Sequence, residues 1–266
     1  MKYSICITHY NNFPTIRQSL DSILTQVDEE YEVVVVDNFS TDGSFEVLKE
    51  YADNGLVKLS RVRCSRGRGR QIAFEESTGD YVVGHLDLDD TFKPRLGELL
   101  KEYHRAAEGK LLWVSSKVEG AFWGGESILI GPRGVIDALG GWNDLQVYED
   151  WELCRRAASK DLYRWGDFQL LEESNAHPER NSGRLGRLRW KYTRLRDMLR
   201  IGRPLQPRSL SPTTRQNIFR FVVGPFIPLF YKTYKNVPNL NWDKSEPRCY
   251  VSIGDEGDNL QTVPPD

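Results

Sequence analysis

Residues 32–37 read Glu-Val-Val-Val-Val-Asp, and this stretch decides the fold class. A strand with four consecutive valines is apolar on both faces, which is typical of a parallel sheet covered by helices on either side. Similar strand patterns occur at Tyr3–Thr8, Val57–Val62 and Tyr81–Leu88, with helical patterns between them. This alternation predicts a three-layer α/β/α sandwich with a mostly parallel central sheet and right-handed crossovers.

The second half of the chain continues with shorter patterns. Apolar periodicity predicts helices and strands in alternation up to about residue 160. The expected helices are Pro94–Ala107, Val135–Leu139 and Tyr148–Ala158, and the expected strands are Leu111–Val118 and Ser127–Ile130. A basic helix is expected over Leu185–Ile201, after the composition changes near residue 180.

Composition limits the class of protein. With 266 residues, 39% hydrophobic and 28% charged, the chain is typical of a soluble globular protein with a substantial core. No apolar run is long enough for an ordinary transmembrane helix, and the N-terminus enters a strand pattern directly. The four cysteines are far apart and form no CxxC pair, which favours a reducing compartment. We expect a cytoplasmic protein, or one at the cytoplasmic face of a membrane.

Three carboxylates follow the strand pattern at residues 81–88. Asp87, Asp89 and Asp90 lie within four positions, and their mutual repulsion favours a divalent cation. Hard oxygen ligands suit Mg²⁺ or Mn²⁺, which can also hold substrate phosphates. Because ligands bind beyond the carboxyl ends of parallel strands, the polar loops at 8–11 and 37–42 should share this rim. Chemistry on a phosphorylated ligand is therefore indicated.

The chain resembles the family-2 glycosyltransferases, which are inverting enzymes of the GT-A fold that use nucleotide-sugar donors. Six motifs carry the resemblance, in order, over about residues 3–160. They are Ile5-Cys-Ile-Thr-His-Tyr-Asn11, Val35-Val-Asp-Asn-Phe-Ser-Thr-Asp-Gly43, Gly67-Arg-Gly-Arg70, Thr78-Gly-Asp-Tyr-Val82, Leu86-Asp-Leu-Asp-Asp90 and Tyr148-Glu-Asp-Trp-Glu-Leu153. One departure is Arg66, near which the family commonly has an asparagine.

The resemblance implies a nucleotide site built from loop residues. Its members would bind the base, ribose and diphosphate, and they are Thr8, Tyr10, Asn11, Asp37, Arg70 and Asp87. Asp37 would contact the base, and Asp87 the ribose or a metal-bound water. Asp37 could instead cap a turn or helix, as Ser40 or Asp42 could. Taken alone, the arginines at 66–70 could be a solvated basic loop leading into a helix over Gln71–Ser77.

The resemblance also implies a metal site and a catalytic base. Asp89 and Asp87 would hold Mn²⁺ or Mg²⁺, and some family members use a histidine at the position of His177 as a further ligand. Asp150 would be the general base that deprotonates the acceptor, with Glu149 orienting it or contacting the acceptor. Both acids could simply favour the positive end of a helix dipole. Asp90 is expected to cap the helix that begins near Pro94, while Gly124-Gly125 and Trp142 would shape the sugar and acceptor pocket.

The C-terminal part differs from the rest. Residues 184–220 hold eleven Arg or Lys and one acid, Asp197. We expect a catalytic domain over 1–183, a basic and apolar helical extension over 184–243, and a polar, disordered tail over 244–266. The extension, with its aromatic segment at 218–235, is either a helix packed on the catalytic domain or a peripheral anchor to an anionic membrane surface. Both interpretations stay open.

The leading hypothesis is a metal-dependent glycosyltransferase with a nucleoside-diphosphate sugar donor and a glycan or lipid-linked acceptor. A sugar-phosphate nucleotidyltransferase would need a Gly-rich basic loop after the first strand, where this chain has His9-Tyr-Asn-Asn12. A nucleic-acid-binding protein could use the basic 184–220 stretch. The near-neutral net charge and the lack of a recognisable binding module argue against a nucleic-acid partner.

Overall fold

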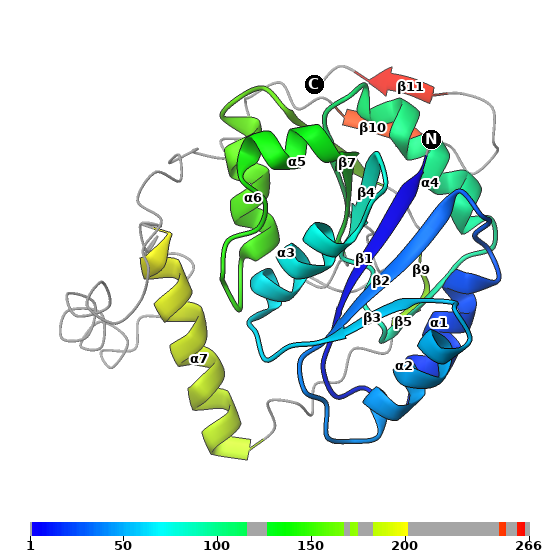
Figure 1. Ribbon diagram of the computed structural model, residues 1–266. Coiled ribbons are helices and arrows are strands. Elements are labelled where there is room, and N and C mark those ends of the chain that lie inside the picture. Colours follow the sequence, from blue (N-terminus) through cyan, green and yellow to red (C-terminus); the bar gives the residue numbers. More distant parts are fainter. Residues whose placement is uncertain are drawn as a thin grey trace.

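A mixed nine-stranded sheet crosses the protein, and helices cover both of its faces (Figure 1). The computed structural model describes residues 2–115, 127–167, 171–174, 183–201, 250–253 and 260–263. The strands of the large sheet, in spatial order, are β11 (Leu260–Val263), β10 (Tyr250–Ile253), β8 (Tyr163–Asp167), β6 (Leu111–Ser115), β7 (Ser127–Pro132), β4 (Tyr81–Gly84), β1 (Tyr3–His9), β2 (Tyr31–Asp37) and β3 (Lys58–Arg61). A two-stranded sheet pairs β5 (Asp90–Phe92) with β9 (Leu171–Ser174).

The sheet is parallel from β3 through β4, as the four valines predict. Strand β7 runs antiparallel to both β4 and β6, whereas β8 runs parallel to β6. At the far edge β10 is parallel to β8, and β11 turns back against β10. The carboxyl ends of β1, β2 and β4 therefore lie together at one edge of the sheet.

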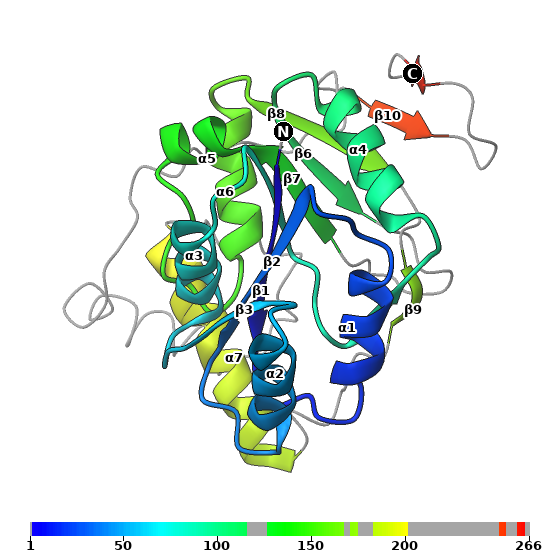
Figure 2. The same ribbon diagram turned by 45° about the vertical axis from the view of Figure 1, so that its right-hand side comes forward.

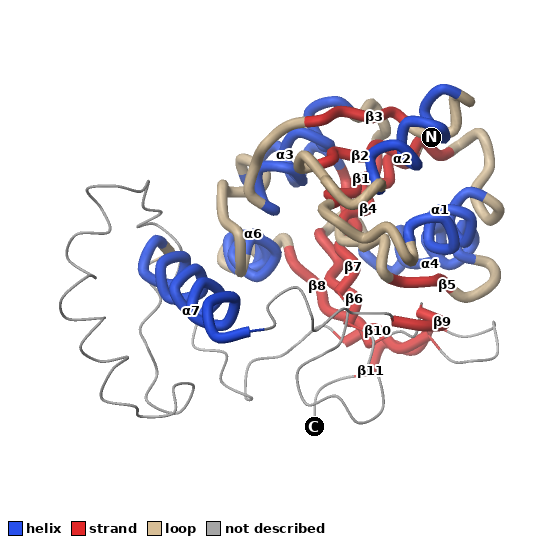
Figure 3. The backbone as a smooth tube through the Cα atoms, turned by 90° about the horizontal axis from the view of Figure 1, so that it is seen from below, coloured by secondary structure: helices blue, strands red, loops and turns tan. Residues whose placement is uncertain are grey.

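The helices form two layers, which Figures 2 and 3 show from other sides. One layer holds α1 (Ile16–Leu24), α2 (Ser44–Asp53) and α4 (Leu96–Ala107), and the other holds α3 (Arg66–Glu76), α5 (Arg133–Leu139) and α6 (Glu149–Ala158). A further helix, α7 (Gly183–Arg200), lies beside α6. The predicted three-layer α/β architecture is confirmed.

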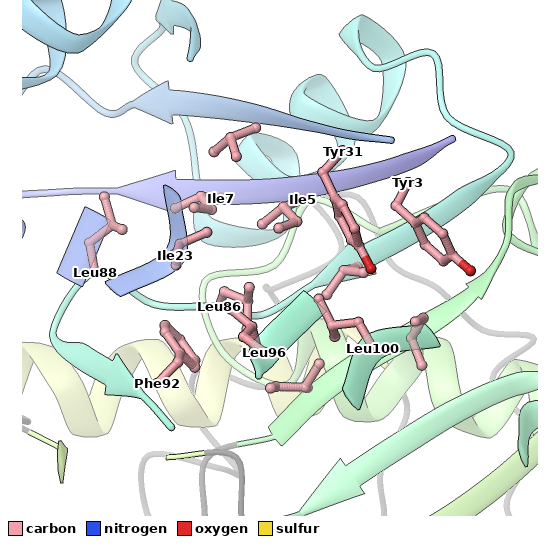
Figure 4. Packing of buried hydrophobic residues seen from close by; sticks show 14 of the residues in the cluster. Tyr3, Ile5, Ile7, Ile23, Tyr31, Leu86, Leu88, Phe92, Leu96 and Leu100 are labelled. Carbon is pink, nitrogen blue, oxygen red and sulfur yellow. The ribbon is translucent and has the colours of Figure 1, made fainter. Parts of the chain in front are cut away.

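Strand β2 shows why both layers are needed. Side chains of a strand alternate between the two faces of its sheet. Val33 and Val35 accordingly belong to the core beneath α1, α2 and α4, whereas Val34 and Val36 belong to the core beneath α3, α5 and α6. Figure 4 shows the first core, where β1, α1 and α4 contribute buried aliphatic side chains that include Ile5, Ile23 and Leu100.

A single buried carboxylate joins the amino-terminal ends of these strands. Glu32 of β2 accepts hydrogen bonds from Ser4 Oγ of β1 (2.7 Å), from Lys58 Nζ of β3 (2.6 Å) and from the amide of Gly79 before β4 (3.0 Å). Burial alone would raise the pKa of this carboxyl, but its donors outweigh burial and lower the pKa to about 2.

The described cysteines, Cys6, Cys64 and Cys154, are free thiols. Burial raises the pKa of Cys6 to about 12 and that of Cys64 to about 11, and it raises the pKa of Cys154 well above the ordinary value. These thiols are thus protonated at neutral pH.

Several element boundaries differ from the sequence predictions. Strand β4 ends at Gly84 rather than at residue 88, because His85 adopts a left-handed conformation (φ 73°) that an extended strand cannot continue through. Helix α3 begins at Arg66, because the Ser65 hydroxyl caps it by accepting from the amide of Arg68 (3.1 Å). The expectation of a loop over residues 66–70 is therefore wrong.

The C-terminal predictions meet a mixed outcome. Strands β10 and β11 lie inside the stretch 244–266, for which a polar, disordered tail was expected, and β10 pairs with β8 of the large sheet. The aromatic segment at 218–235 lies outside the described residues. Within the part of the chain that the structure describes, no helix is long and apolar enough to cross a membrane.

Candidate active site

Asp37, the last residue of β2, is fully buried. Its carboxylate accepts a hydrogen bond from the amide of Ser40 (3.0 Å) and pairs with Arg61 Nε at 3.3 Å. Asp37 therefore caps its own turn, as the alternative interpretation holds. Contact of Asp37 with a base stays a prediction.

The loop after β1 lies against this turn. Asn11 has a left-handed backbone (φ 47°), its amide donates to Ser40 Oγ (2.9 Å), and its Oδ1 accepts from the amide of Thr41 (2.8 Å). Tyr10 leaves about half of its surface in solvent (48%). The Oγ1 atom of Thr8 is buried with no hydrogen-bond partner among the described residues. These residues form a polar and aromatic rim beside the end of β2.

Helix α3 directs Arg70 into the protein. Gly67, Arg70 and Phe74 are buried, and their spacing of three and four residues places them on one helix face. The Arg70 guanidinium lies 3.3 Å from Glu149 (Nε to Oε1) and 3.6 Å from Asp87 (Nη2 to Oδ1). Its Nη1 atom is buried and has no hydrogen-bond partner in the described chain. An unpartnered guanidinium donor of this kind suits an anion.

Two glycines let α3 approach its neighbours closely. A Cβ on Gly67 would lie 2.1 Å from the carbonyl oxygen of Asn143, and one on Gly69 would lie 2.5 Å from Thr8 Cγ2. The amide of Gly67 donates to the carbonyl of Leu145 (2.8 Å). Helix α3 thereby contacts both the loop before α6 and Thr8 of β1.

Glu149 lies buried at the start of α6, facing Arg70. Burial, and then the neighbouring charge of Asp150, raise the pKa of Glu149 to about 7, although Arg66 and Arg70 oppose the shift. Arg66 Nε lies 3.9 Å from the same carboxylate. Glu149 thus supports the inward position of Arg70.

Asp150 faces a histidine that the sequence motifs did not single out. Its carboxylate is about a quarter exposed (27%) and lies 3.8 Å from His85 Nδ1. The indole Nε1 of Trp142 donates to His85 Nε2 (3.3 Å), so Nδ1 carries the proton and directs it toward Asp150. Burial, and then the charges of Arg70 and Arg66, hold the pKa of His85 well below its usual range. His85 is therefore a neutral imidazole whose Nδ1 lies near the Asp150 carboxylate, beyond direct hydrogen-bond distance.

The sequence contained one signal for His85. It is a histidine within an otherwise apolar strand pattern, between Gly84 and Leu86. Nothing in that pattern predicts the left-handed backbone that turns the residue toward α6.

The acidic loop at 87–90 divides into two parts. The side chains of Asp87 and Asp89 are partly exposed, and Asp87 contacts Arg70. Asp90 instead opens strand β5 and pairs with Ser174 of β9, so its carboxylate is buried. The predicted capping role of Asp90 is wrong, because α4 begins at Leu96 with Arg95 at its N-cap.

The donor set at this loop is compatible with a hard divalent cation. The negative charge of the loop is seen in its effect on Arg66. Burial acts to lower the pKa of Arg66, but four nearby carboxylates outweigh burial and raise that pKa; they are Glu149, Asp87, Asp150 and Asp89. Two partly exposed carboxylates suit Mg²⁺ or Mn²⁺ when substrate phosphates and water complete the shell. No group of three or more His, Cys, Asp or Glu within the described residues forms a closed metal site. His177 and Gly124-Gly125 lie outside those residues.

The structure thus brings together most of the predicted catalytic and diphosphate residues. Asp87, Arg70, Glu149 and Asp150 form one cluster with His85. Thr8 adjoins the cluster through Gly69, while Tyr10, Asn11 and Asp37 gather around the loop after β2. Trp142 is buried under His85.

Residues 4–158 match the family model described as "Glycosyl transferase family 2". An uncharacterized glycosyltransferase of Nostoc sp. is 31% identical over 111 residues, which are 41% of this chain and 34% of that protein. The poly(ribitol-phosphate) beta-glucosyltransferase of Bacillus spizizenii is 32% identical over 126 residues, which are 45% of this chain and 19% of that protein. The matches thus span well under two thirds of these relatives' lengths.

Solved structures with the same fold include TarS 1-349 of S. aureus in complex with UDP. It has a TM-score of 0.55 and 19% identity, and the match covers 67% of this chain and 62% of that chain. A mannosyltransferase from Pyrobaculum calidifontis in complex with GDP-Man and Mn²⁺ has a TM-score of 0.50 and 19% identity, over 85% of this chain and 71% of that chain. At this identity the likeness concerns the fold, and it supports the expected GT-A architecture.

Proposed function

Because the chain belongs to glycosyl transferase family 2, we propose that it moves a sugar from a nucleoside-diphosphate sugar to an acceptor hydroxyl or phosphate, with inversion at the anomeric carbon. The observation that carries the proposal is the juxtaposition of two groups. Arg70 has a buried guanidinium with an unpartnered Nη1, and Asp150 has a partly exposed carboxylate in the same cluster. The guanidinium can donate hydrogen bonds to a leaving diphosphate, and the carboxylate can accept the proton of an attacking hydroxyl.

In a direct displacement at the anomeric carbon, each residue of the cluster would have a separate role. Asp150 accepts the proton of the acceptor hydroxyl as its oxygen attacks the anomeric carbon. The neutral His85 imidazole lies beside that carboxylate, with Nδ1 at 3.8 Å from it, and a small shift of either side chain would let Nδ1–H donate to Asp150. Arg70 donates to the diphosphate, whose negative charge grows as the glycosidic bond breaks. Asp89 and Asp87 would hold a divalent cation, which when bound stabilises the same charge.

The nucleoside end of the donor is assigned to the loops after β1 and β2. Thr8, Asn11 and Asp37 offer polar groups there, and Tyr10 offers an exposed aromatic surface. Solved relatives hold UDP or UDP-GlcNAc and, in another case, GDP-Man. Curated relatives are named for transfer to poly(ribitol-phosphate). A uridine nucleotide sugar and a phosphate-bearing polymer acceptor are therefore the first pair to test, with glycan and lipid-linked acceptors next. The family membership does not favour a nucleotidyltransferase.

A thermal-shift screen tests donor binding. A ligand that binds only the native state raises the melting temperature, so a nucleotide sugar should do so, and more strongly with Mn²⁺ or Mg²⁺. No shift with any UDP- or GDP-sugar, with or without metal, would contradict the proposal. Arg70→Ala should weaken binding of the nucleoside diphosphate and leave binding of the nucleoside unchanged.

The proposed base is tested by Asp150→Asn. This variant should bind the donor as the wild type does, while the transfer rate falls by about 10²- to 10⁴-fold. Asp161→Asn is a matched control, because the Asp161 side chain is 93% exposed and pairs with Lys110 at the surface (3.0 Å). Transfer at an undiminished rate by Asp150→Asn would show that another group is the base.

A further inference from the structure

Helix α7 lies beyond the family match, which ends at residue 158, yet it contacts the segment that leads into the acidic pair. That segment, residues 143–148, ends at Tyr148, directly before Glu149 and Asp150. Figures 1 and 3 show α7 beside α6. One interpretation of the sequence was a helix packed on the catalytic domain, and in the structure Asp197, the single acid in the sequence of this helix, makes such a contact.

Asp197 of α7 is fully buried. Its Oδ2 accepts hydrogen bonds from the amides of Gln146 (2.9 Å) and Val147 (3.1 Å). Its Oδ1 accepts hydrogen bonds from Arg196 Nε (2.8 Å) and Arg200 Nη1 (3.3 Å). A carboxylate with both oxygens engaged and its charge balanced by two guanidinium groups is a strong, directional anchor for these two amides.

A second contact from α7 reaches Tyr148. Arg194 donates to the Tyr148 hydroxyl from Nη2 (2.9 Å) and from Nε (3.1 Å). Tyr148 has a left-handed backbone (φ 69°) and is the N-cap residue of α6. Its carbonyl accepts a hydrogen bond from the amide of Glu152 in the first turn of that helix (2.9 Å). Such a conformation costs about 1 kcal/mol or more in a residue with a side chain, so surrounding contacts must hold it.

Helix α3 holds the opposite side of the same segment. The amide of Gly67 donates to the carbonyl of Leu145 (2.8 Å), and the amide of Arg66 donates to Gln146 Oε1 (3.3 Å). The Ser65 hydroxyl donates to Asp144. The segment is thus bound between the start of α3 and the last two turns of α7, directly before α6 begins.

We propose that Asp197 is a positioning residue for Glu149 and Asp150, acting through the amides of Gln146 and Val147. The inference rests on the proposed function, because it concerns the residue assigned there as the base. It assigns α7 a role in transfer and none in nucleoside binding. Outside α7, the hydrogen bonds of Asp197 and Arg194 described above go to residues 146–148, whereas the residues assigned to the nucleoside lie at the ends of β1 and β2 and on the loop after β1.

The test compares the full-length wild type with Asp197→Ala and Asp197→Asn. Arg189→Ala is the matched control, because Arg189 is an exposed cation on the same helix. Hydrogen exchange is followed in a peptide over residues 143–150 and in a reference peptide over β2. Transfer kinetics are measured with UDP-GlcNAc as the donor and poly(ribitol-phosphate) as the saturating acceptor, and binding of UDP-GlcNAc is measured separately by thermal shift.

For Asp197→Ala we expect exchange in 143–150 to accelerate at least tenfold, with β2 unchanged. The kcat should fall by about 10- to 100-fold, because small misplacement of a reacting group is costly, while the donor Kd stays within about twofold. Asp197→Asn keeps an acceptor oxygen for the amides and should give an intermediate kcat. Arg189→Ala should match the wild type in exchange and rate.

Unchanged exchange over 143–150 in Asp197→Ala would overturn the proposal. An equal loss of kcat and donor affinity would also overturn it, since that pattern indicates a general loss of structure. If Asp197→Ala does not fold, Asp197→Asn and Arg194→Ala decide the question by the same two readouts. Absence of transfer in the wild type would count against the proposed function alone, because the exchange comparison needs no sugar.

Discussion

Glu149 is a carboxyl group whose ionised form is disfavoured by its surroundings. Its pKa is raised to about 7 by burial and by Asp150, whereas an unfolded glutamate titrates near 4.5. The stabilising contribution of this group is therefore fully present below about pH 4.5 and is lost as the pH rises through about 7. Relative to the wild type, Glu149→Gln should gain about 3 kcal/mol in free energy of unfolding between pH 5 and pH 8.

Urea unfolding at both pH values measures this change. Glu76→Gln, a substitution at the end of α3 away from the cluster, serves as the control and should show no such gain. A pH-independent difference between Glu149→Gln and the wild type would mean that Glu149 titrates as an ordinary acid.

At the residue scale, the sequence predicted which acidic and basic residues meet in the candidate active site. It did not predict the roles of the residues beside them. Arg70, Asp87, Glu149 and Asp150 follow motifs with set places relative to the strands, so their meeting could be expected. The role of His85 could not, because it depends on a left-handed backbone after β4. Asp90 was misassigned because its strand partner, Ser174, lies far along the chain.

At the scale of elements, Glu32 links β1, β2, β3 and the turn before β4. Its pKa is lowered to about 2, so it stabilises the fold above the unfolded value near 4.5 and loses this effect as the pH falls toward 2. We expect Glu32→Gln to lower the free energy of unfolding by about 2 kcal/mol at pH 7, with the difference from wild type shrinking in acid.

Equilibrium urea unfolding at pH 7 and pH 3 would measure both effects. Glu29→Gln, at an exposed neighbouring position, is the control and should change the free energy by less than about 0.5 kcal/mol. A Glu32→Gln protein as stable as the wild type at pH 7 would rule out this linking role.

Helix α3 shows why element boundaries were harder to predict than element order. Glycine lowers helix propensity, so the alternating Gly and Arg of residues 66–70 predicted a loop. The Ser65 cap and the hydrogen bond from Gly67 to Leu145 override that preference. The second contact is tertiary, and local sequence does not contain it.

At the scale of the whole molecule, the sheet separates two cores. Leu100 of α4 belongs to one and Leu153 of α6 to the other, and both are fully buried. Each Leu→Ala change should lower the free energy of unfolding by about 3 kcal/mol. Because the sheet lies between them, the two losses should add to within about 0.5 kcal/mol in the double variant.

Denaturant unfolding of the single and double variants measures the coupling. Leu86→Ala with Leu100→Ala is a comparison within one core and should show a coupling larger than about 0.5 kcal/mol. Strong coupling between Leu100 and Leu153 would show that strain passes through the sheet.

The order of elements over the first half of the molecule could be predicted because β1 through β4 are neighbours joined by regular crossovers. The rest of the sheet could not. Strand β7 runs against its neighbours, and β10 pairs with a strand that precedes it by more than eighty residues. Short strands of this kind carry little periodicity, and distant pairing determines them.

The buried, protonated thiols can be used to measure local unfolding of the protein. Only a thiolate reacts readily with a maleimide, so Cys6, Cys64 and Cys154 should be labelled slowly while the fold is closed. With Cys249 replaced by serine, mass spectrometry of labelled peptides would give the labelling rate of each of the three cysteines. These rates would rank how readily the structure around each cysteine unfolds. Cys64, which is only partly buried, should be labelled first. Cys6 lies in β1, which is paired on both sides, and should be labelled only when the sheet itself comes apart.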